Sequence, residues 1–315
     1  MIDLCILGTT GGMPMVNKYL SATLININGR KILIDCGEGT QVAMREIGWG
    51  FKSIDLICIT HSHGDHIIGL PGLLSTMGNS GRTEKVIIVG PKGIKEIVNG
   101  LNIINPYLPY ELEVVELENN DLKFIIDKNN MFLCEDNDKC NLILSSLEVE
   151  HSAKCLSYSF YIKRRPRFSV EKASKNNVPK LLWSKLQNQE IINYNNKIYT
   201  PDLVLDNARK GIKISYVTDT RPISILPQFI KYSDLFICEG TYGSDEDIDK
   251  AIKNKHMTFR ESATLAKKGE CNELILTHFS PALSAPENFL NNAKEIFHNS
   301  IVAHDGLIKT LKFKD

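Results

Sequence analysis

The chain has 315 residues, of which 43% are hydrophobic and 23% are charged, a composition typical of a folded globular protein and not of a disordered or fibrous one. Lysine plus arginine and aspartate plus glutamate number 37 each, so there is no overall positive charge to attract nucleic acid, and any polyanion site must be a local patch. No run of about 18 apolar residues is present, so we expect no membrane span, and the length suits one large α/β unit.

The eight cysteines are scattered, and none belongs to a Cys-x-x-Cys pair. We interpret them as buried free thiols in a reducing compartment and not as a disulfide framework. The chain begins with an apolar strand and a glycine turn, without the basic region and cleavage site of a secretory signal. We therefore expect a cytoplasmic protein.

The first half of the chain alternates predicted strands and helices. The predicted strands are Ile2–Leu7, Ala22–Ile27, Lys31–Asp35, Asp55–Thr60, Lys85–Val89, Glu111–Leu117 and Leu122–Ile126. The predicted helices are Thr40–Ile47, Ile68–Met77 and Gly93–Asn102.

The second half repeats this style. Its predicted strands are Leu142–Val149, Ser157–Ile162, Lys213–Val217, Leu235–Cys238 and Glu273–Leu276. Two helices there have capping-box starts: Thr258 with Glu261, in a helix that Gly269 can end, and Ser284 with Glu287, in a helix that runs toward His298. Two β-rich halves flanked by helices predict a four-layer αββα sandwich that occupies residues 1–315 as a single domain.

A six-residue segment, HSHGDH at 61–66, follows a short apolar strand and carries most of the chemical information. Imidazole and carboxylate groups are ligands for divalent metals such as zinc. In an extended segment His61 and His63 point the same way, whereas the adjacent Asp65 and His66 point apart and can reach a second ion. A solvated polar loop is the alternative, but the whole chain has only eight histidines, so this density favours metal binding.

Three further candidates each lie just past the carboxyl end of a predicted strand: His151, Asp219 and His278. A single histidine in such a place is usually a satisfied polar residue. Three strands that end in the same way favour a shared site, because ligands gather at the carboxyl ends of strands in α/β sheets. His298 and His304 lack this setting, and we interpret them as structural.

The predicted ligands divide into two sets by reach. The set for one ion is His61, His63 and His151, and the set for the other is Asp65, His66 and His278. Asp219 bridges both ions, because a carboxylate has two oxygens to share. Such a pair of ions would ionise a water molecule between them and so supply a nucleophile. Asp65 can bind metal with one oxygen and hold the proton of that nucleophile with the other.

Two residues outside the ligand set can supply a proton. Glu239 follows a predicted strand and His256 precedes the capped helix at Thr258. A carboxylate paired with a histidine can keep the imidazole protonated as a general acid. The alternative is an ion pair that fixes a loop, and the residues alone favour that reading.

One segment, residues 163–210, is polar, rich in Asn and Lys and weakly periodic. It starts with four cationic side chains in six residues: Lys163, Arg164, Arg165 and Arg167. An insertion of this length is either a mobile surface linker or a flexible arm that grips a polyanion, and the sequence leaves both open.

The chain resembles the metallo-β-lactamase superfamily and, within it, the ribonuclease Z family of tRNA 3′-processing endoribonucleases, in its short form. The motifs that carry the resemblance are GTTGGMP at 8–14, DCGEGTQ at 35–41, THSHGDHIIGLPGLLST at 60–76, His151-Ser152, VTDT at 217–220, CEGTY at 238–242, His256-Met257-Thr258 and THFSP at 277–281. The third of these is more specific than HxHxDH alone.

The resemblance implies the αββα metallo-β-lactamase sandwich with an inserted arm, two zinc ions per subunit and Glu239 with His256 as the proton-donating pair. It implies endonucleolytic removal of the 3′ trailer from precursor tRNA, leaving a 3′ hydroxyl. It also implies a homodimer, in which the arm of one subunit holds tRNA for the partner's active site. RPRFSVEKA at 165–173 is similar to the usual start of that arm.

The chain also departs from the family pattern. The usual PxKxRN is PMVNKY at residues 14–19, the arm's Gly-Pro is Lys180-Leu181, and Ser184 replaces a usual Gly. The first departure leaves the treatment of the 3′ CCA end open, and those in the arm leave its stiffness and its mode of tRNA binding open. Two other functions stay in view: a hydrolase of the same fold for small phosphodiesters or esters, and an RNA-binding protein with a dead site, against which the complete ligand set argues.

Overall fold

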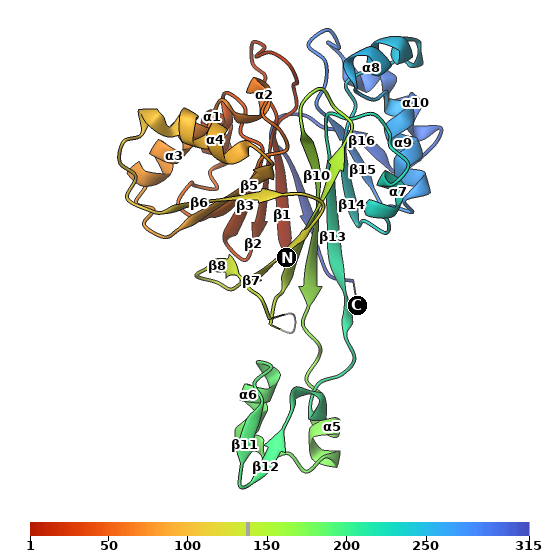
Figure 1. Cartoon of the computed structure of the whole chain (residues 1–315). Helices are drawn as coiled ribbons and strands as arrows, with labels where there is room; N and C mark the ends of the chain where they lie inside the picture. The colour runs from red at the N-terminus through yellow and green to blue at the C-terminus, as the bar shows by residue number, and fades with distance from the viewer. Residues whose placement is uncertain (137–138, 315) are drawn as a thin grey trace.

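In the computed structural model, which describes residues 1–136 and 139–314, two β-sheets face each other and helices cover both outer faces (Figure 1). The predicted four-layer αββα sandwich is therefore confirmed. The core between the sheets combines Leu4 and Ile6 of one sheet with Tyr158 and Phe160 of the other. In the described residues no helix has the length and apolar character needed to cross a membrane.

The first sheet has the strand order β17-β1-β2-β3-β4-β5-β6. Its strands are β1 (Ile2–Gly8), β2 (Ala22–Ile27), β3 (Arg30–Ile34), β4 (Ile54–Cys58), β5 (Val86–Pro91), β6 (Leu112–Leu117) and β17 (Leu307–Leu311). β4 and β5 are buried along their whole length, which explains their almost continuous apolar sequences. The last strand pairs with the first, with Ile2 opposite Leu311.

The second sheet has the order β16-β15-β14-β13-β10-β9-β7-β8. Its strands are β7 (Asp121–Ile126), β8 (Met131–Leu133), β9 (Leu142–Val149), β10 (Cys155–Arg164), β13 (Arg209–Val217), β14 (Leu235–Glu239), β15 (Leu274–Thr277) and β16 (Ser300–Val302). β13 to β16 run parallel, so their carboxyl ends reach the same edge of the sheet.

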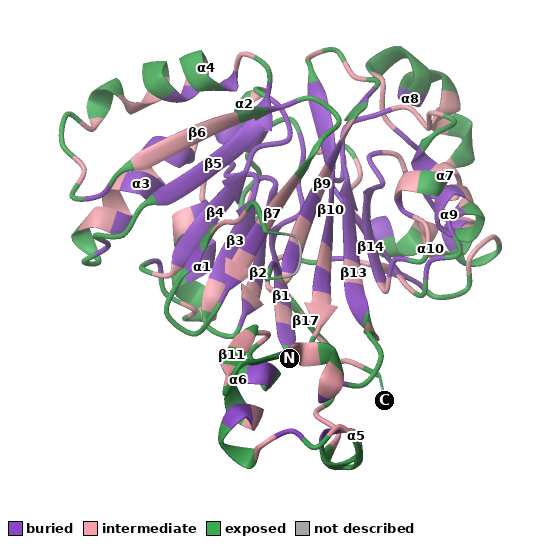
Figure 2. Ribbon diagram, turned by 60° about the horizontal axis from the view of Figure 1, so that its bottom comes forward, coloured by how far each residue is buried: buried purple, intermediate pink, exposed green. Residues whose placement is uncertain are grey.

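The helices bury one side against the sheets and expose the other (Figure 2). On the first sheet these are α1 (Thr40–Ile47), α3 (Leu70–Asn79) and α4 (Ile94–Leu101); on the second, α7 (Leu226–Phe229), α9 (Phe259–Lys268) and α10 (Leu290–Lys294). The short helices α2 (Gly64–Ile67) and α8 (Ile248–Asn254) lie near one end of the sandwich. Short 3₁₀ turns occur at Asn102–Ile104, Lys180–Leu182, Pro201–Leu203, Asp245–Asp247 and Pro286–Phe289.

The inserted segment forms a small folded unit, here called the arm (residues 165–208), at the end of the sandwich opposite α2 and α8 (Figure 1). It contains α5 (Val170–Lys175), α6 (Trp183–Gln187), β11 (Ile192–Tyr194) and β12 (Lys197–Tyr199). It has its own core, made of Ala173, Val178, Leu182, Leu186, Tyr199, Val204 and Leu205. Lys163 and Arg164 belong to β10, so the insertion begins two residues later than the sequence suggested.

One predicted helix start is confirmed and another is wrong. Thr258 and Glu261 form a complete capping box at the start of α9. Ser284 does not cap a helix: Ala285 is the N-terminal flanking residue, and a 3₁₀ turn begins at Pro286. The reason is the proline, because the residue before a proline is disfavoured in helical conformation, while a proline fits the first helical position.

Candidate metal centre

All seven predicted ligand side chains lie together at the end of the sandwich opposite the arm. His61 lies three residues past the end of β4, and His151 lies two residues past β9. Asp219 follows β13 in the same way, and His278 follows β15 directly. The chain segments that carry them are far apart in sequence, and the sandwich brings their strand ends to one edge. Of the remaining three, His63 directly precedes α2, and Asp65 and His66 lie in it.

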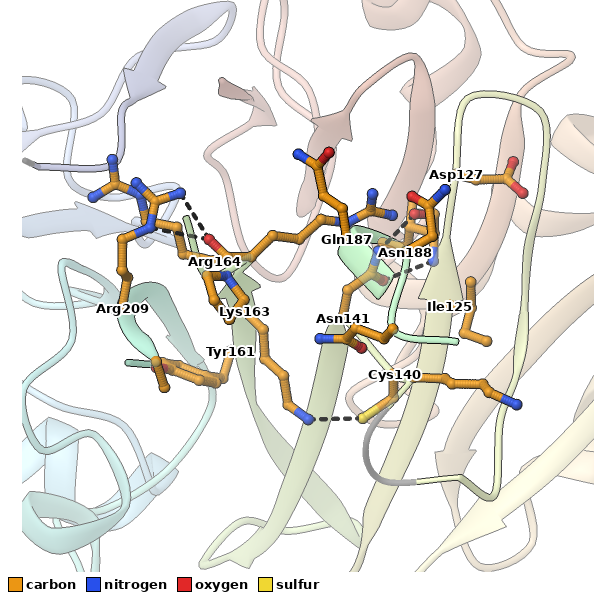
Figure 3. A pocket seen from close by; sticks show the side chains of 16 residues that line it. Ile125, Asp127, Cys140, Asn141, Tyr161, Lys163, Arg164, Gln187, Asn188 and Arg209 are labelled. Atoms are coloured by element: carbon orange, nitrogen blue, oxygen red, sulfur yellow. Dashed lines mark hydrogen bonds between the residues drawn. The ribbon is translucent and has the colours of Figure 1, made fainter. Parts of the chain in front are cut away.

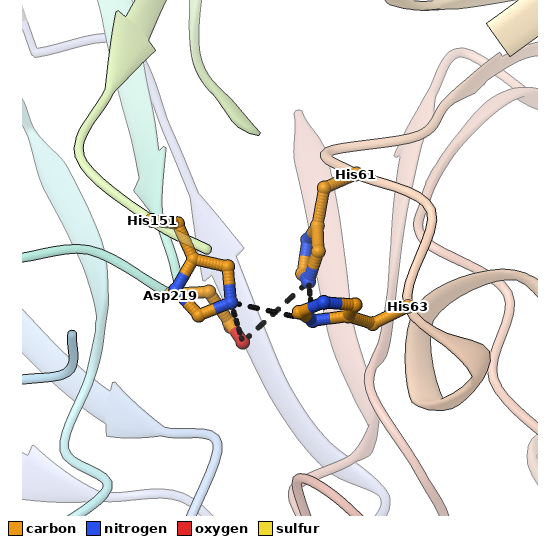
Figure 4. A group of neighbouring side chains, drawn as sticks. All are labelled: His61, His63, His151 and Asp219. Atoms are coloured by element: carbon orange, nitrogen blue, oxygen red, sulfur yellow. Dashed lines mark hydrogen bonds and ion pairs between the residues drawn. The ribbon is translucent and has the colours of Figure 1, made fainter. Parts of the chain in front are cut away.

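The first group surrounds one point with side chains from three loops (Figure 4). Nε2 of His61 lies 2.9 Å from Nδ1 of His63, and Nε2 of His151 lies 3.3 Å from the same atom. Oδ2 of Asp219 lies 3.7 Å from Nε2 of both His61 and His151.

The second group is equally compact. Nε2 of His66 lies 3.2 Å from Nε2 of His278 and 3.3 Å from Oδ2 of Asp65. Oδ1 of Asp219 lies 3.4 Å from Nε2 of His66 and 3.2 Å from Nε2 of His278. Asp219 therefore directs one oxygen into each group. Asp65 and His66 do not point apart as predicted for an extended segment, because they occupy a helical turn whose side chains converge.

The donor atoms in both groups fit a divalent ion. A tetrahedral ion with bonds of about 2.0–2.1 Å needs ligand atoms roughly 3.4 Å from one another. The observed separations of 2.9–3.7 Å between ligand atoms bracket that value. Imidazole nitrogen with one or two carboxylate oxygens is a donor set for zinc and related metals. His298 and His304 belong to no such group within the part of the chain that the structure describes.

In four of the histidines, the ring nitrogen that faces away from the centre contacts a neighbouring group. The sequence did not identify these neighbours as functional. Such outer contacts fix the orientation and the tautomer of a metal-binding histidine. The contacts are Asp35 Oδ2 at 2.8 Å from His66 Nδ1, Thr241 Oγ1 at 3.2 Å from His278 Nδ1, Thr60 Oγ1 at 3.1 Å from His61 Nδ1, and the Lys255 carbonyl at 3.3 Å from His151 Nδ1. A signal for Asp35 was present, because it follows an apolar strand as Asp219 does.

Three residues of the centre adopt the left-handed backbone region that non-glycine residues seldom occupy. Asp35, Asp219 and His278 have φ angles of 58°, 47° and 57°. Each follows the end of a strand, so the sharp turn aims its side chain across the strand ends. Such conformations cost on the order of 1–3 kcal/mol each and persist where the surrounding structure enforces them. In this centre the strained backbone positions two metal ligands, Asp219 and His278, and the carboxylate of Asp35, which orients His66.

The first glycine turn lets the chain approach the centre closely. A Cβ atom on Gly11 would lie 2.3 Å from the imidazole ring of His278, so no larger residue fits. The N–H of Gly12 donates to Oδ2 of Asp65 at 2.6 Å. This donor gives the GTTGGMP turn a chemical role, because it fixes one carboxylate oxygen of Asp65 beside His66 and His278.

Burial and neighbouring charges set the protonation states of two ligands, His61 and Asp219. Burial lowers the pKa of His61 well below its usual value, which keeps its imidazole neutral. Burial alone would raise the pKa of Asp219, but the imidazoles of His278, His66 and His61 outweigh it and hold the pKa well below its usual range. A neutral imidazole and an ionised carboxylate are the protonation states that bind metal.

Glu239 and His256 lie together beside the centre. Nδ1 of His256 lies 3.2 Å from the Glu239 carboxylate, which also accepts the N–H groups of Thr220 at 2.7 Å and Met257 at 3.0 Å. Burial favours the neutral form of His256, but the Glu239 carboxylate outweighs it and raises the pKa of His256 to about 9. The His256 ring stacks on His278 with ring centroids 5.5 Å apart. An imidazolium is thus held next to the metal groups.

Part of the metal centre and His256 line an open cleft of about 360 Å³, whose walls include His63, Asp65, His151, Asp219, His256 and His278. Its rim adds Lys253, Asn254 and Lys255, which place two further cations beside His256. The four cations predicted to bind substrate are not in this cleft. Lys163 and Arg164 lie at the far end of β10, whose first residue, Cys155, has its sulfur 3.8 Å from Nδ1 of His61.

Comparison with known proteins gives matches along the whole chain. The chain is 98% identical over all 315 residues to a ribonuclease Z from Clostridium botulinum (strain Alaska E43 / Type E3), and 58% identical over 316 aligned positions to one from Clostridium perfringens, with both chains fully covered in each case. A family model described as Anti-Pycsar protein Apyc1 matches residues 2–200, so the chain also belongs to the family of that description.

Solved structures agree on the fold. Human tRNase Z, short form, superposes with a TM-score of 0.67 at 22% identity, covering 98% of this chain and 99% of that one. The metallo-β-lactamase fold protein YhfI from Bacillus subtilis superposes with a TM-score of 0.66 at 17% identity, covering 98% and 100%.

Proposed function

The chain belongs to the ribonuclease Z family, and from that premise we propose that it binds two zinc ions and cuts precursor tRNA endonucleolytically, removing the 3′ trailer. The enzyme is a hydrolase of the metallo-β-lactamase fold that processes tRNA 3′ ends. The observation that carries the proposal is the pair of donor groups into which Asp219 directs one oxygen each.

The two groups of side chains would each hold one ion. His61, His63 and His151 would hold the first and Asp65, His66 and His278 the second, with Asp219 between them. When bound, two zinc ions lower the pKa of a water molecule toward neutrality and neutralise charge on a phosphodiester. The protein keeps both donor sets in fixed orientation through Asp35, Thr60, Thr241 and the Lys255 carbonyl.

His256 would act as the general acid. Cleavage that leaves a 3′ hydroxyl on the tRNA requires a proton for the departing 3′ oxygen. The imidazolium of His256 lines the cleft, and the buried carboxylate of Glu239 keeps it charged. Asp65, whose Oδ2 is fixed by the N–H of Gly12, would accept the proton of the attacking water. Both steps use groups already held at the cleft.

The arm would bind the body of the tRNA. The arm contains seven Lys or Arg residues and four Asp or Glu residues, counted over residues 165–208, whereas the whole chain is neutral. This local excess of positive charge suits a polyanion, and Arg165 and Arg167 belong to it. The roles predicted for Lys163 and Arg164 in substrate binding remain predictions.

A homodimer would explain how the arm can hold tRNA at a metal cleft although it lies at the other end of the sandwich from its own. The ten residues of β10 separate the arm from the metal centre by roughly 30 Å at about 3.3 Å per residue. An arm on one subunit therefore cannot fold back onto its own cleft, but a two-fold arrangement brings it to the partner's. A cytoplasmic location is supported by eight free cysteines, seven of them buried.

Purified protein on a precursor tRNA with a 3′ trailer tests the proposal directly. Metal content is measured on the same sample, and the product ends are mapped to one nucleotide. We expect two zinc ions per chain and one cut that leaves a 3′ hydroxyl. Uncut transcript in the presence of both ions, together with hydrolysis of bis(p-nitrophenyl) phosphate, would favour the alternative hydrolase for small phosphodiesters.

A further inference from the structure

Arg221 connects two loops of the metal centre. It lies two residues past Asp219, and Nη1 of its guanidinium donates to the backbone carbonyl of His256. The same nitrogen donates to Oε2 of Glu261 at 3.0 Å, and Nη2 donates to Oε1 of that carboxylate. One planar guanidinium therefore holds both the main chain of His256 and the first turn of α9, because its N–H groups form a rigid fork.

This arginine is itself anchored. Its backbone N–H donates to the carbonyl of Glu150 at 3.1 Å, next to the ligand His151. The side chain of Arg221 is 16% exposed and that of Glu261 is 21% exposed. The pair is therefore shielded from much of the solvent that makes surface ion pairs weak and mobile.

A guanidinium also fixes a backbone carbonyl at the other end of the sandwich. Arg209 donates twice to the carbonyl of Arg165, at 3.0 and 2.7 Å, where β10 leaves for the arm (Figure 3). The two contacts are similar in kind but hold different segments. Loss of the Arg209 contact would affect the base of the arm, whereas loss of the Arg221 contact would affect His256.

Three consecutive residues after β13 have separate contacts at the centre. Asp219 directs one oxygen into each donor group, and the N–H of Thr220 donates to the Glu239 carboxylate at 2.7 Å. Arg221 holds the carbonyl of His256, whose ring nitrogen Nδ1 lies 3.2 Å from Glu239. His256 is thus held at its ring and at its main chain, and both contacts depend on the segment that carries Asp219.

Two simpler roles for Arg221 can be distinguished from this one. It is not among the described residues that line the cleft, so direct contact with substrate there is not its role. Its partner Glu261 also accepts the N–H of Thr258 at 3.0 Å in the capping box, so Arg221 also supports the start of α9. A purely structural role of that kind predicts lower stability without a selective effect on proton donation.

We propose that Arg221 is a positioning residue for the proton-donating step. It fixes the main chain of His256 so that the imidazolium meets the departing 3′ oxygen. Proton transfer requires hydrogen-bond reach of roughly 2.6–3.2 Å between the heavy atoms, and a misplacement of about 1 Å can cost about 10²-fold in rate. The inference rests on the proposed function of His256 as the general acid.

The first test compares two substrates. In metal-loaded Arg221→Gln we expect kcat on precursor tRNA to fall tenfold or more, with KM and metal content within twofold of the parent. Hydrolysis of bis(p-nitrophenyl) phosphate, whose leaving group needs no proton, stays within twofold. The matched control is Arg260→Gln, which removes another paired guanidinium from α9, the one that contacts Asp245 and Glu295, and leaves both activities unchanged.

A double variant shows whether Arg221 acts through His256. When Arg221→Gln is added to His256→Ala, we expect less than a twofold further loss of kcat, because the acid is already absent. Hydrogen exchange of the metal-loaded protein gives a readout that needs no activity. The amides of His256 and Met257 donate to the Ala251 carbonyl and to Glu239, so their exchange is slow while the segment keeps its place. Arg221→Gln speeds it tenfold or more, and Arg260→Gln does not.

Four results overturn the proposal: equal losses on the two substrates, a loss in Arg260→Gln as large as that in Arg221→Gln, an additive loss in the double variant, or unchanged exchange at His256 and Met257. Thermal unfolding shows whether each variant has folded. Arg221→Lys, which keeps the charge but not the planar fork, is the second variant and shows the same selective loss at a smaller size. If the parent cuts no precursor tRNA with both ions bound, the proposed function fails, while hydrogen exchange still decides whether Arg221 holds the segment.

Discussion

The carboxylate of Asp35 lies 2.8 Å from Nδ1 of His66, and both side chains are completely buried. The same carboxylate accepts the backbone N–H of Thr60 at 2.7 Å and the Thr60 hydroxyl. Asp35 thus connects the end of β3 to the loop after β4 and leaves Nε2 of His66 directed into the metal centre. Its own φ of 58° is part of the same arrangement.

Asp35→Asn is therefore expected to weaken metal binding about 10- to 100-fold, the usual effect of losing such an outer contact. The amide keeps the volume of the side chain but not its charge, so the orientation and basicity of His66 suffer. Zinc affinity is measured by competition with a chelating dye. Asp3→Asn on β1, which also loses a carboxylate, is the control and should bind metal as the parent does. Equal affinity in both variants would show that Asp35 is only structural.

Because Asp219 contacts both groups, loss of Asp219 and loss of a ligand of one group are expected to remove different numbers of metal ions. Asp219→Ala removes a ligand from both groups and is expected to abolish binding of both ions, with activity lost in parallel. His63→Ala removes a ligand from one group only, so one ion should remain. Metal per chain, measured by elemental analysis after gel filtration, separates the two cases. Retention of two ions by Asp219→Ala would rule out the bridging role.

The Glu239–His256 pair predicts a change in pH dependence. Because the pKa of His256 is raised to about 9 by Glu239, the imidazolium persists through neutral pH and is lost as the pH rises through that value. Glu239→Gln removes the stabilising charge and lowers the pKa of His256, so the alkaline fall of kcat/KM should move to lower pH. An unmoved alkaline limb would argue against the pair.

His256→Ala tests the acid itself. It should reduce kcat on precursor tRNA by about 10²–10⁴-fold, the usual contribution of a general acid. Metal content is measured on the same variant, because His256 also forms a possible ligand group with Asp219 and His278. It should stay the same when His256 donates a proton and binds no metal. A substrate whose leaving group needs no proton, such as bis(p-nitrophenyl) phosphate, should lose much less activity, and this comparison distinguishes proton donation from damage to the site.

Removal of the arm is expected to affect precursor tRNA and a small phosphodiester differently. Residues 167–207 can be replaced by a short glycine-rich turn, because β10 and β13 stay paired up to Arg164 and Arg209. Binding of precursor tRNA should be lost, whereas hydrolysis of bis(p-nitrophenyl) phosphate should persist. Lys180→Gln in the intact chain is a finer probe and should lower the salt dependence of tRNA affinity by about one released counterion. Undiminished tRNA binding by the shortened chain would contradict the role of the arm.

The elements whose bounds were predicted correctly are those in which the local sequence signals agree with one another. β2, α1 and β9 have the predicted bounds because period, capping and burial agree there. The metal ligands were found for a related reason, since each lies next to a strand end and carries a donor group. Strands as short as β8 and β16 were missed, because three residues show no periodicity and are fixed by pairing with neighbours.

Long-range contacts explain what the sequence could not reveal. The helical turn of α2, which brings Asp65 beside His66, ends an otherwise polar loop and has no apolar stripe of its own. The arm looked unstructured because its core is small and assembled from positions as distant as Ala173 and Val204. The outer contacts of Thr241 and Lys255 involve a hydroxyl and a backbone carbonyl, groups that carry no sequence signature.

The pairing of β17 with β1 has a consequence for the newly made chain. β1 is synthesised well before its edge partner β17 (Leu307–Leu311), which comes at the other end of the sandwich's sequence. Asp305, from the same late segment, also accepts the N–H groups of Thr9 and Tyr19 beside the glycine turn. Until β17 has been made, β1 exposes an unpaired edge that can pair with other nascent chains. A chain that stops before β17 is thus expected to aggregate and not to fold as a slightly shortened enzyme.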